Sequence, residues 1–180
     1  MRTSAVQIAF FAFALVVAAA LQELSPAVGG AKAALLGAVA FRAALTRSLV
    51  PALVCALAAG GLHDALSSLP GFCMSGFLMA VCAAAALVRG TDRPERRQAR
   101  RNGGRGGAGA VLAACIFAAV APLGELWTRL WLWRMDPSIF AGLLFSAVAG
   151  FLAELAVFPA MDAMERACGI PCDFREGGAS

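Results

Sequence analysis

Long apolar runs separated by short polar segments make up most of the chain up to residue 159. An α-helix needs about 20 residues to cross the roughly 30 Å hydrocarbon core of a bilayer. Four runs are close to that length and hold almost no charged residue: 4–21, 69–88, 108–127 and 137–159. The pattern predicts four membrane-spanning helices at these positions.

The region between the first two runs is also apolar, but charged and helix-breaking residues interrupt it. We divide it into spans 27–45 and 49–66. Lys32 and Arg42 lie near the ends of the first piece, where a long side chain can reach the membrane surface. Pro51 and the Gly60–Gly61 pair interrupt the second piece. The two pieces are either two further spans or one short re-entrant hairpin, and both alternatives leave the later helices in the same orientation.

Composition restricts the class of protein. Hydrophobic residues make up 61% of the 180 residues and charged residues 14%, against about 25% charged in ordinary soluble domains. This balance excludes a soluble globular domain, a disordered chain and a disulfide-rich secreted module. The polar stretches 89–107 and 162–180 are too short to bury a core of their own. We predict an all-α, polytopic bundle of about six helices, forming a single transmembrane domain over residues 1–180.

An arginine-rich loop at 89–107 sets the expected orientation, because short basic loops stay in the cytoplasm. Counting spans from it places both termini in the cytoplasm and the three tryptophans at 127–133 in an aromatic belt at the outer surface. Nucleic-acid binding is disfavoured because no aromatic residues interleave with the arginines. The loop residues expected to anchor the topology and contact anionic lipid are Arg93, Arg96, Arg97, Arg100 and Arg101.

The first segment also resembles a signal peptide, with Arg2, an apolar stretch and then small residues at 18–20. Its removal would leave the later topology unchanged.

No pattern of residues points to catalysis or to a cofactor. The chain lacks the nucleophile-elbow, zinc-protease, phosphate-loop and dinucleotide patterns, and it has one histidine. Four cysteines lie in apolar spans, where a thiol behaves as a small hydrophobic group. Cys168 and Cys172 lack further ligands for a metal. We expect no cofactor, no metal site and no enzymatic activity.

Charged residues inside the spans are the main candidates for function. Matched depth predicts that Arg42 pairs with Glu154, and the i,i+4 spacing predicts that Glu125 pairs with Arg129. Asp64 follows Gly60 and Gly61 at the outer end of its span, where we expect it to be presented to a partner. Its replacement by alanine should then impair assembly more than stability. The alternatives for these charges are structural pairing, partner contact and ligand binding.

Small residues recur at four-residue spacing in the last span, at Gly142, Ser146 and Gly150. Such a stripe lets helices approach closely. It serves either packing within the bundle or docking of a helix from another membrane protein.

Three features resemble the MreD family of bacterial rod-shape-determining membrane proteins. The first is the size, with about six helices and both ends inside. The second is the stretch 47–72, where a helix ends in a Gly-x-x-x-Asp turn, Gly60 to Asp64, before a span that contains Gly71 and Gly76. The third is the closing segment 158–169 of the last helix, with a proline near its cytoplasmic end.

The resemblance implies a non-enzymatic scaffold of the bacterial cytoplasmic (inner) membrane. Such a protein would bind a bitopic MreC-like partner. Through it, the protein would help connect the actin-like filament to the cell-wall synthases.

The resemblance also implies a fold similar to the substrate-binding subunits of energy-coupling-factor transporters, which raises an alternative function. A capture subunit for a small molecule needs a pocket with convergent polar groups near the outer face. The residues available there are His63, Asp64, Ser67, Ser68, Glu125 and Arg129.

Overall fold

The computed structural model describes residues 2–28, 31–67, 72–90, 107–133 and 136–169. These residues form six α-helices and no strand. The helices are α1 (Arg2–Leu24), α2 (Leu35–Thr46), α3 (Leu49–Leu66), α4 (Cys73–Gly90), α6 (Gly107–Trp131) and α7 (Ile139–Ala167). Four of them, α1, α3, α6 and α7, are long and apolar enough to cross a membrane. The chain is therefore an all-α, multi-pass membrane protein.

The short helix α2 forms the centre of the molecule. It contacts each of the other five described helices, and its nine consecutive residues from Leu36 to Ala44 are all buried. A helix that is buried all round must present small or apolar residues on every face. The α2 sequence LLGAVAFRAALT meets this condition everywhere except at Arg42.

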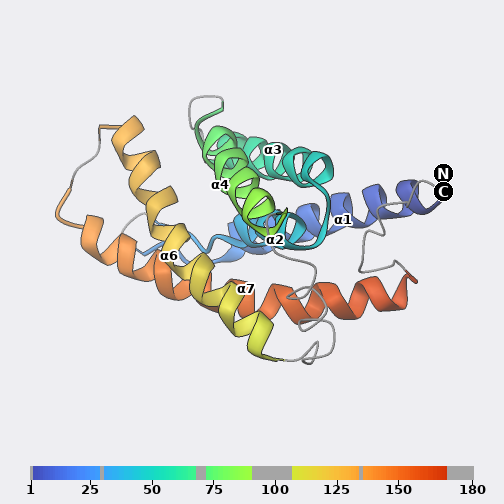
Figure 1. Ribbon diagram of the computed structural model, residues 1–180. Helices are drawn as coiled ribbons and strands as arrows, with labels where there is room; N and C mark the ends of the chain where they lie inside the picture. Colours follow the sequence, from blue (N-terminus) through green and yellow to red (C-terminus); the bar gives the residue numbers. More distant parts are fainter. Residues whose placement is uncertain (1, 29–30, 68–71, 91–106, 134–135, 170–180) are drawn as a thin grey trace.

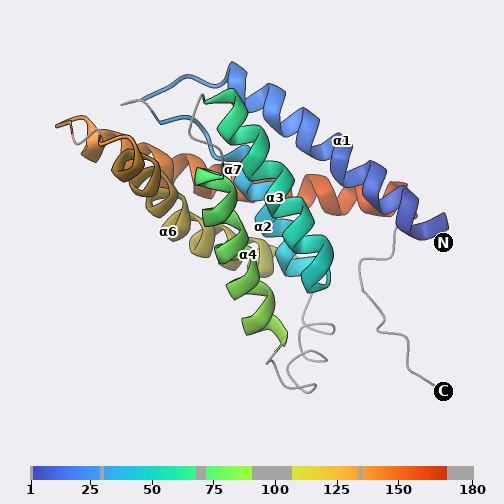
Figure 2. The same cartoon turned by 90° about the horizontal axis from the view of Figure 1, so that it is seen from above.

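The remaining helices are arranged around α2 as two hairpins and one single helix (Figure 1). Helices α3 and α4 form one antiparallel hairpin, and α6 and α7 form the other. Helix α1 lies beside α3, as the view from above shows (Figure 2). Direct contact between the hairpins is sparse and runs between α4 and α6.

Helix α2 is shorter than the predicted span 27–45. Its 12 residues extend about 18 Å at 1.5 Å per residue, which is less than the hydrocarbon core. Before α2 the chain makes a tight bridge instead of a helix. Val28 and Ala31 exchange two backbone hydrogen bonds of 2.9 and 3.0 Å. Pro26 and two glycines, which disfavour a continuous helix, explain why the helix begins late.

The last helix is longer than predicted. We expected the span to close at residue 159, but α7 continues through Pro159 to Ala167. Helix α6 likewise continues through Pro122. Transmembrane helices tolerate an interior proline because neighbouring groups satisfy the freed backbone carbonyl.

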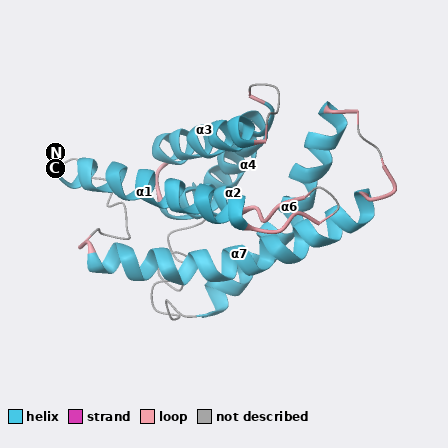
Figure 3. Cartoon of the chain, turned by 180° about the vertical axis from the view of Figure 1, so that it is seen from behind, coloured by secondary structure: helices cyan, strands magenta, loops and turns pink. Residues whose placement is uncertain are grey.

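The helices alternate in direction, so the bundle has two distinct ends. We call one the pocket end: α1, α3 and α6 finish there and α2, α4 and α7 begin there, around the cavity described below. We call the other the arginine end, since Arg42 and Arg47 lie there near the end of α2. Helices and connecting loops make up the whole of the described chain (Figure 3).

Candidate functional site

The turn between α3 and α4 rests on a close contact at Gly60. A Cβ atom at this position would lie 2.3 Å from the Ser75 Cα and 2.6 Å from the Ser75 backbone nitrogen, so only glycine fits. The adjacent Gly61 has no atom within 4 Å of its Cβ position and faces outward. The two glycines that the sequence places side by side therefore have different environments.

Asp64 caps the first turn of α4. Its Oδ1 accepts a 2.8 Å hydrogen bond from the Met74 backbone N–H. Its Oδ2 accepts bonds from the N–H and the hydroxyl of Ser75 at 3.3 and 2.9 Å. The side chain is buried, with 4% of its surface exposed. The carboxylate is used inside the chain to satisfy the free amides at a helix N-terminus. The structure therefore gives Asp64 a structural role, and the effect of its replacement on partner assembly stays a prediction.

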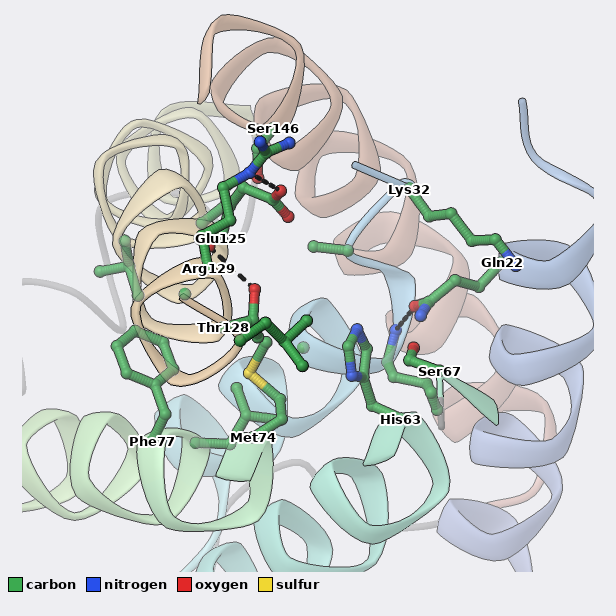
Figure 4. A pocket seen from close by; sticks show the side chains of 18 of the residues that line it. Gln22, Lys32, His63, Ser67, Met74, Phe77, Glu125, Thr128, Arg129 and Ser146 are labelled. Atoms are coloured by element: carbon green, nitrogen blue, oxygen red, sulfur yellow. Dashed lines mark hydrogen bonds and ion pairs between the residues drawn. The ribbon is translucent and has the colours of Figure 1, made fainter. Parts of the chain in front are cut away.

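A cavity of about 500 Å³ opens at the pocket end, where the two hairpins diverge. This volume lies within the range of small-molecule sites. Helices α3 and α4 line one side of the cavity, α6 lines the other, and the start of α2 forms its floor (Figure 4). The lining combines apolar side chains, such as Phe77 and Leu78 of α4, with polar side chains from α3 and α6.

The polar side chains of the cavity come from opposite walls. On α6, Glu125 Oε1 accepts a 2.7 Å hydrogen bond from Arg129 Nε, so the predicted i,i+4 pair is confirmed. Thr128 lies between them in sequence and also lines the cavity. Across the cavity, His63 and Ser67 extend from the end of α3 (Figure 4).

Two further polar residues enclose the cavity from the side of α1. Lys32 forms a 2.6 Å ion pair with Glu23. Gln22 is almost fully buried, and its Oε1 accepts a 3.2 Å hydrogen bond from the Leu36 backbone N–H at the start of α2. The sequence pattern did not single out Gln22. A glutamine at the end of an apolar run is equally compatible with a position at the membrane surface and with a buried one.

Four residues of the predicted outer polar cluster line this cavity: His63, Ser67, Glu125 and Arg129. Asp64 is not among the lining residues because it faces the start of α4. Ser68 lies outside the described residues.

The small-residue stripe of α7 packs inside the molecule. Gly142, Ser146 and Gly150 are all buried, and a Cβ on Gly150 would lie 2.8 Å from the Ala121 Cβ of α6. Of the two alternatives for the stripe, the structure selects packing within the bundle. The stripe cannot serve as a docking face in this arrangement.

Two ion pairs join the end of α2 and the residue after it to α7 at the arginine end. Arg42 pairs with Asp162, and Arg47 pairs with Glu165. The side chains of Arg47 and Glu165 are 3% and 0% exposed. The sequence placed Asp162 and Glu165 in a tail after the last span, so both partners were missed. Their i,i+3 spacing beyond Pro159 was the available signal.

The predicted pairing of Arg42 with Glu154 is wrong in this structure. Arg42 extends to Asp162, which the longer α7 brings within its reach. Glu154 is fully buried, and neither of its carboxylate oxygens has a hydrogen-bond partner in the described chain. Within the described residues, it is the one carboxylate with both oxygens buried and without a hydrogen-bond partner.

Arg93, Arg96, Arg97, Arg100 and Arg101 all lie outside the described residues.

No protein-family model matches this chain, no curated protein matches its sequence, and no solved structure matches its fold.

Proposed function

We propose that this chain is a non-enzymatic scaffold of the bacterial cell-elongation complex. In this role it binds an MreC-like bitopic protein in the cytoplasmic membrane and helps couple an actin-like filament to peptidoglycan synthesis. Both termini and the arginine-rich loop then lie in the cytoplasm, which makes the arginine end cytoplasmic and the pocket end external. The alternation of helix directions is compatible with this orientation.

The observation that supports the proposal is the construction of the α3–α4 hairpin. The segment that carries the family resemblance, Gly60 to Asp64, is also the segment on which this hairpin depends. Gly60 allows the two backbones to touch, and Asp64 fixes the start of α4. Both residues of the motif, Gly60 and Asp64, therefore have a structural role in the α3–α4 hairpin.

The outer face of α3 is the surface we assign to the partner helix. The stripe on α7 is buried, so a partner must use another face. On α3, Val54, Ala58 and Gly61 are exposed at helical spacing, and the small residues at 58 and 61 permit close approach by a second helix.

Affinity purification of the tagged chain from its native membrane in mild detergent tests the proposal. Mass spectrometry of the co-purified proteins is expected to identify a bitopic MreC-like protein or cell-wall synthases. Recovery of neither, from membranes in which both are detected, contradicts the scaffold function.

Two exposed glycines provide a matched pair for the partner surface. Gly61 on α3 and Gly76 on α4 are both exposed, and neither has an atom within 4 Å of its Cβ position. Gly61→Leu should reduce the amount of co-purified partner at least tenfold, and Gly76→Leu should leave it unchanged. Equal recovery with both variants contradicts the assignment of the α3 face.

The cavity at the pocket end favours a second candidate function, the capture of a small molecule for an energy-coupling-factor-type transporter. It provides a volume suited to a ligand together with polar groups on two facing walls. In this case the co-purified proteins would be ATPase and transmembrane coupling subunits.

Native mass spectrometry of the chain in lipid nanodiscs tests this second candidate. A captured molecule should appear as a bound mass that is lost in Ser67→Trp, because Ser67 is exposed and lines the cavity. Ala65→Trp is the matched control, since Ala65 is exposed on the same helix and does not line the cavity. A bound mass retained in Ser67→Trp contradicts this location for the ligand.

A further inference from the structure

Three side chains on α7 lie along one face near the arginine end. Glu154, Phe158 and Asp162 are spaced by four residues, which places each about one turn from the next. The guanidinium of Arg42, from α2, lies 3.8 Å from the centroid of the Phe158 ring and pairs with Asp162. It is therefore held above the middle residue of the three and bonded to one of its two acidic neighbours.

The other acidic neighbour is in an unusual position. Glu154 has no exposed surface, and both of its carboxylate oxygens are buried without a hydrogen bond to the described chain. An ionised carboxylate in such a site carries a large desolvation cost with nothing to offset it. A neutral carboxyl carries a much smaller cost.

Among the described residues, two carboxyl groups and one guanidinium share this face of α7. Helix α2 contributes Arg42 to this face, and Arg47, the residue that follows α2, pairs with Glu165. The charged residues of α6, Glu125 and Arg129, pair with each other at the pocket end. On this face the guanidinium of Arg42 lies between the two carboxyl groups, Glu154 and Asp162.

We propose that Arg42, Glu154 and Asp162 form a binding site for one proton. In the structure described here Glu154 carries the proton and Arg42 pairs with Asp162. When Glu154 releases the proton to water at the arginine end, the guanidinium moves across the Phe158 ring and pairs with the new carboxylate. Asp162, whose side chain is 24% exposed, is then left to water. The aromatic ring stabilises the cation in both positions.

This inference goes beyond the proposed function and does not depend on it. The site makes the position of a charged group at the end of α7 depend on protonation. The partner-recovery experiments above test the scaffold, and they can fail or succeed without affecting the proton site.

Infrared spectroscopy of the full chain in lipid nanodiscs at neutral pH tests the resting state. The wild-type protein should show the carbonyl band of a protonated carboxyl that Glu154→Gln removes. Asp162→Asn should also remove it, because the guanidinium of Arg42, released from Asp162, can then pair with Glu154 and hold it ionised. Glu23→Gln, which changes an exposed carboxylate at the pocket end, is the control and should keep the band.

Three results would overturn the proposal. One is the absence of any band that Glu154→Gln removes. Another is a band that persists unchanged in Asp162→Asn. The third is failure of either single variant to fold, because a neutral Glu154 should tolerate its neutral isostere and because Arg42 should find Glu154 when Asp162 is replaced.

A double-mutant cycle tests the exchange independently. Glu154→Gln and Asp162→Asn should each shift the thermal midpoint by a few degrees at most. Combined, they deprive Arg42 of both carboxyl groups and should remove most of the folded protein. The combination of Glu154→Gln with Glu165→Gln should be additive, because these two residues serve different arginines. Additivity in the first cycle overturns the proposal.

Discussion

Gly60 and Ser75 touch through their backbones, with no space for a side chain at Gly60. The Cβ of any other residue would stand 2.3 Å from the Ser75 Cα. The contact brings the backbones of α3 and α4 directly against each other. The glycine is required for steric reasons, since its position lies in regular helix.

The adjacent glycines of α3 should differ sharply in their tolerance of alanine. Gly60→Ala should destabilise the protein by about 1–3 kcal/mol or more, because the new methyl group collides with backbone that cannot move aside. Gly61→Ala meets no atom and should stabilise the helix by up to about 1 kcal/mol. Thermal unfolding in detergent measures both changes. Similar midpoints for the two variants would contradict the close contact.

Replacement of Asp64 should reduce folding and assembly together. Asp64→Ala leaves the first amides of α4 without their acceptor, at a cost of about 0.5–2 kcal/mol. The amount of partner recovered per folded molecule should stay constant, and Asp64→Asn should retain part of the stability because its amide oxygen still accepts a hydrogen bond. If Asp64→Ala protein is fully stable but recovers less partner, Asp64 contacts the partner directly.

The buried pair at the arginine end should respond differently to single and double replacement. Arg47→Met leaves Glu165 buried without its partner and should cost about 3–5 kcal/mol. Arg47→Met combined with Glu165→Leu removes both charges and should recover most of that loss. The thermal unfolding midpoints of the single and the double variant measure both changes. A double variant as unstable as the single one would show that the pair itself is required.

Cysteine labelling can determine which end of the bundle faces the cytoplasm. Cys168 is exposed just after α7, whereas Cys55, Cys73 and Cys82 are buried. In a chain with Cys115 and Cys172 replaced by serine, a membrane-impermeant maleimide should label Cys168 in inverted membranes but not in intact cells. Ser67→Cys, at the pocket end of the same chain with Cys168 also replaced, should show the opposite behaviour. The reverse result would invert the orientation on which the proposed function depends.

Local patterns in the sequence predicted local structure well. The bounds of α3 agree with the predicted span 49–66, because an apolar run that is bounded by polar residues fixes both ends of a helix. The Glu125–Arg129 pair followed from helical geometry over four residues. Both inferences require knowledge of a single helix only.

Long-range relationships were not accessible in the same way. Matched depth pointed to Glu154 as the partner of Arg42, but the choice between Glu154 and Asp162 depends on how far α7 extends. Pro159 suggested that the helix ends, and tertiary packing in a membrane allows it to continue. The cavity also required the relative placement of two hairpins, which no periodicity in the sequence encodes.

The ion pairs between α2 and α7 also constrain the order in which the protein can be assembled during its synthesis. Arg42 and Arg47 bond to residues 120 and 118 positions later in the chain. A 12-residue helix that carries Arg42 and is followed directly by Arg47 gains little by entering lipid alone. The central helix must therefore wait near the membrane surface or inside the translocation machinery until the last helix has left the ribosome. A ribosome-bound chain that stops before residue 162 should accordingly remain sensitive to proteases around α2, and sensitivity should disappear once α7 is complete.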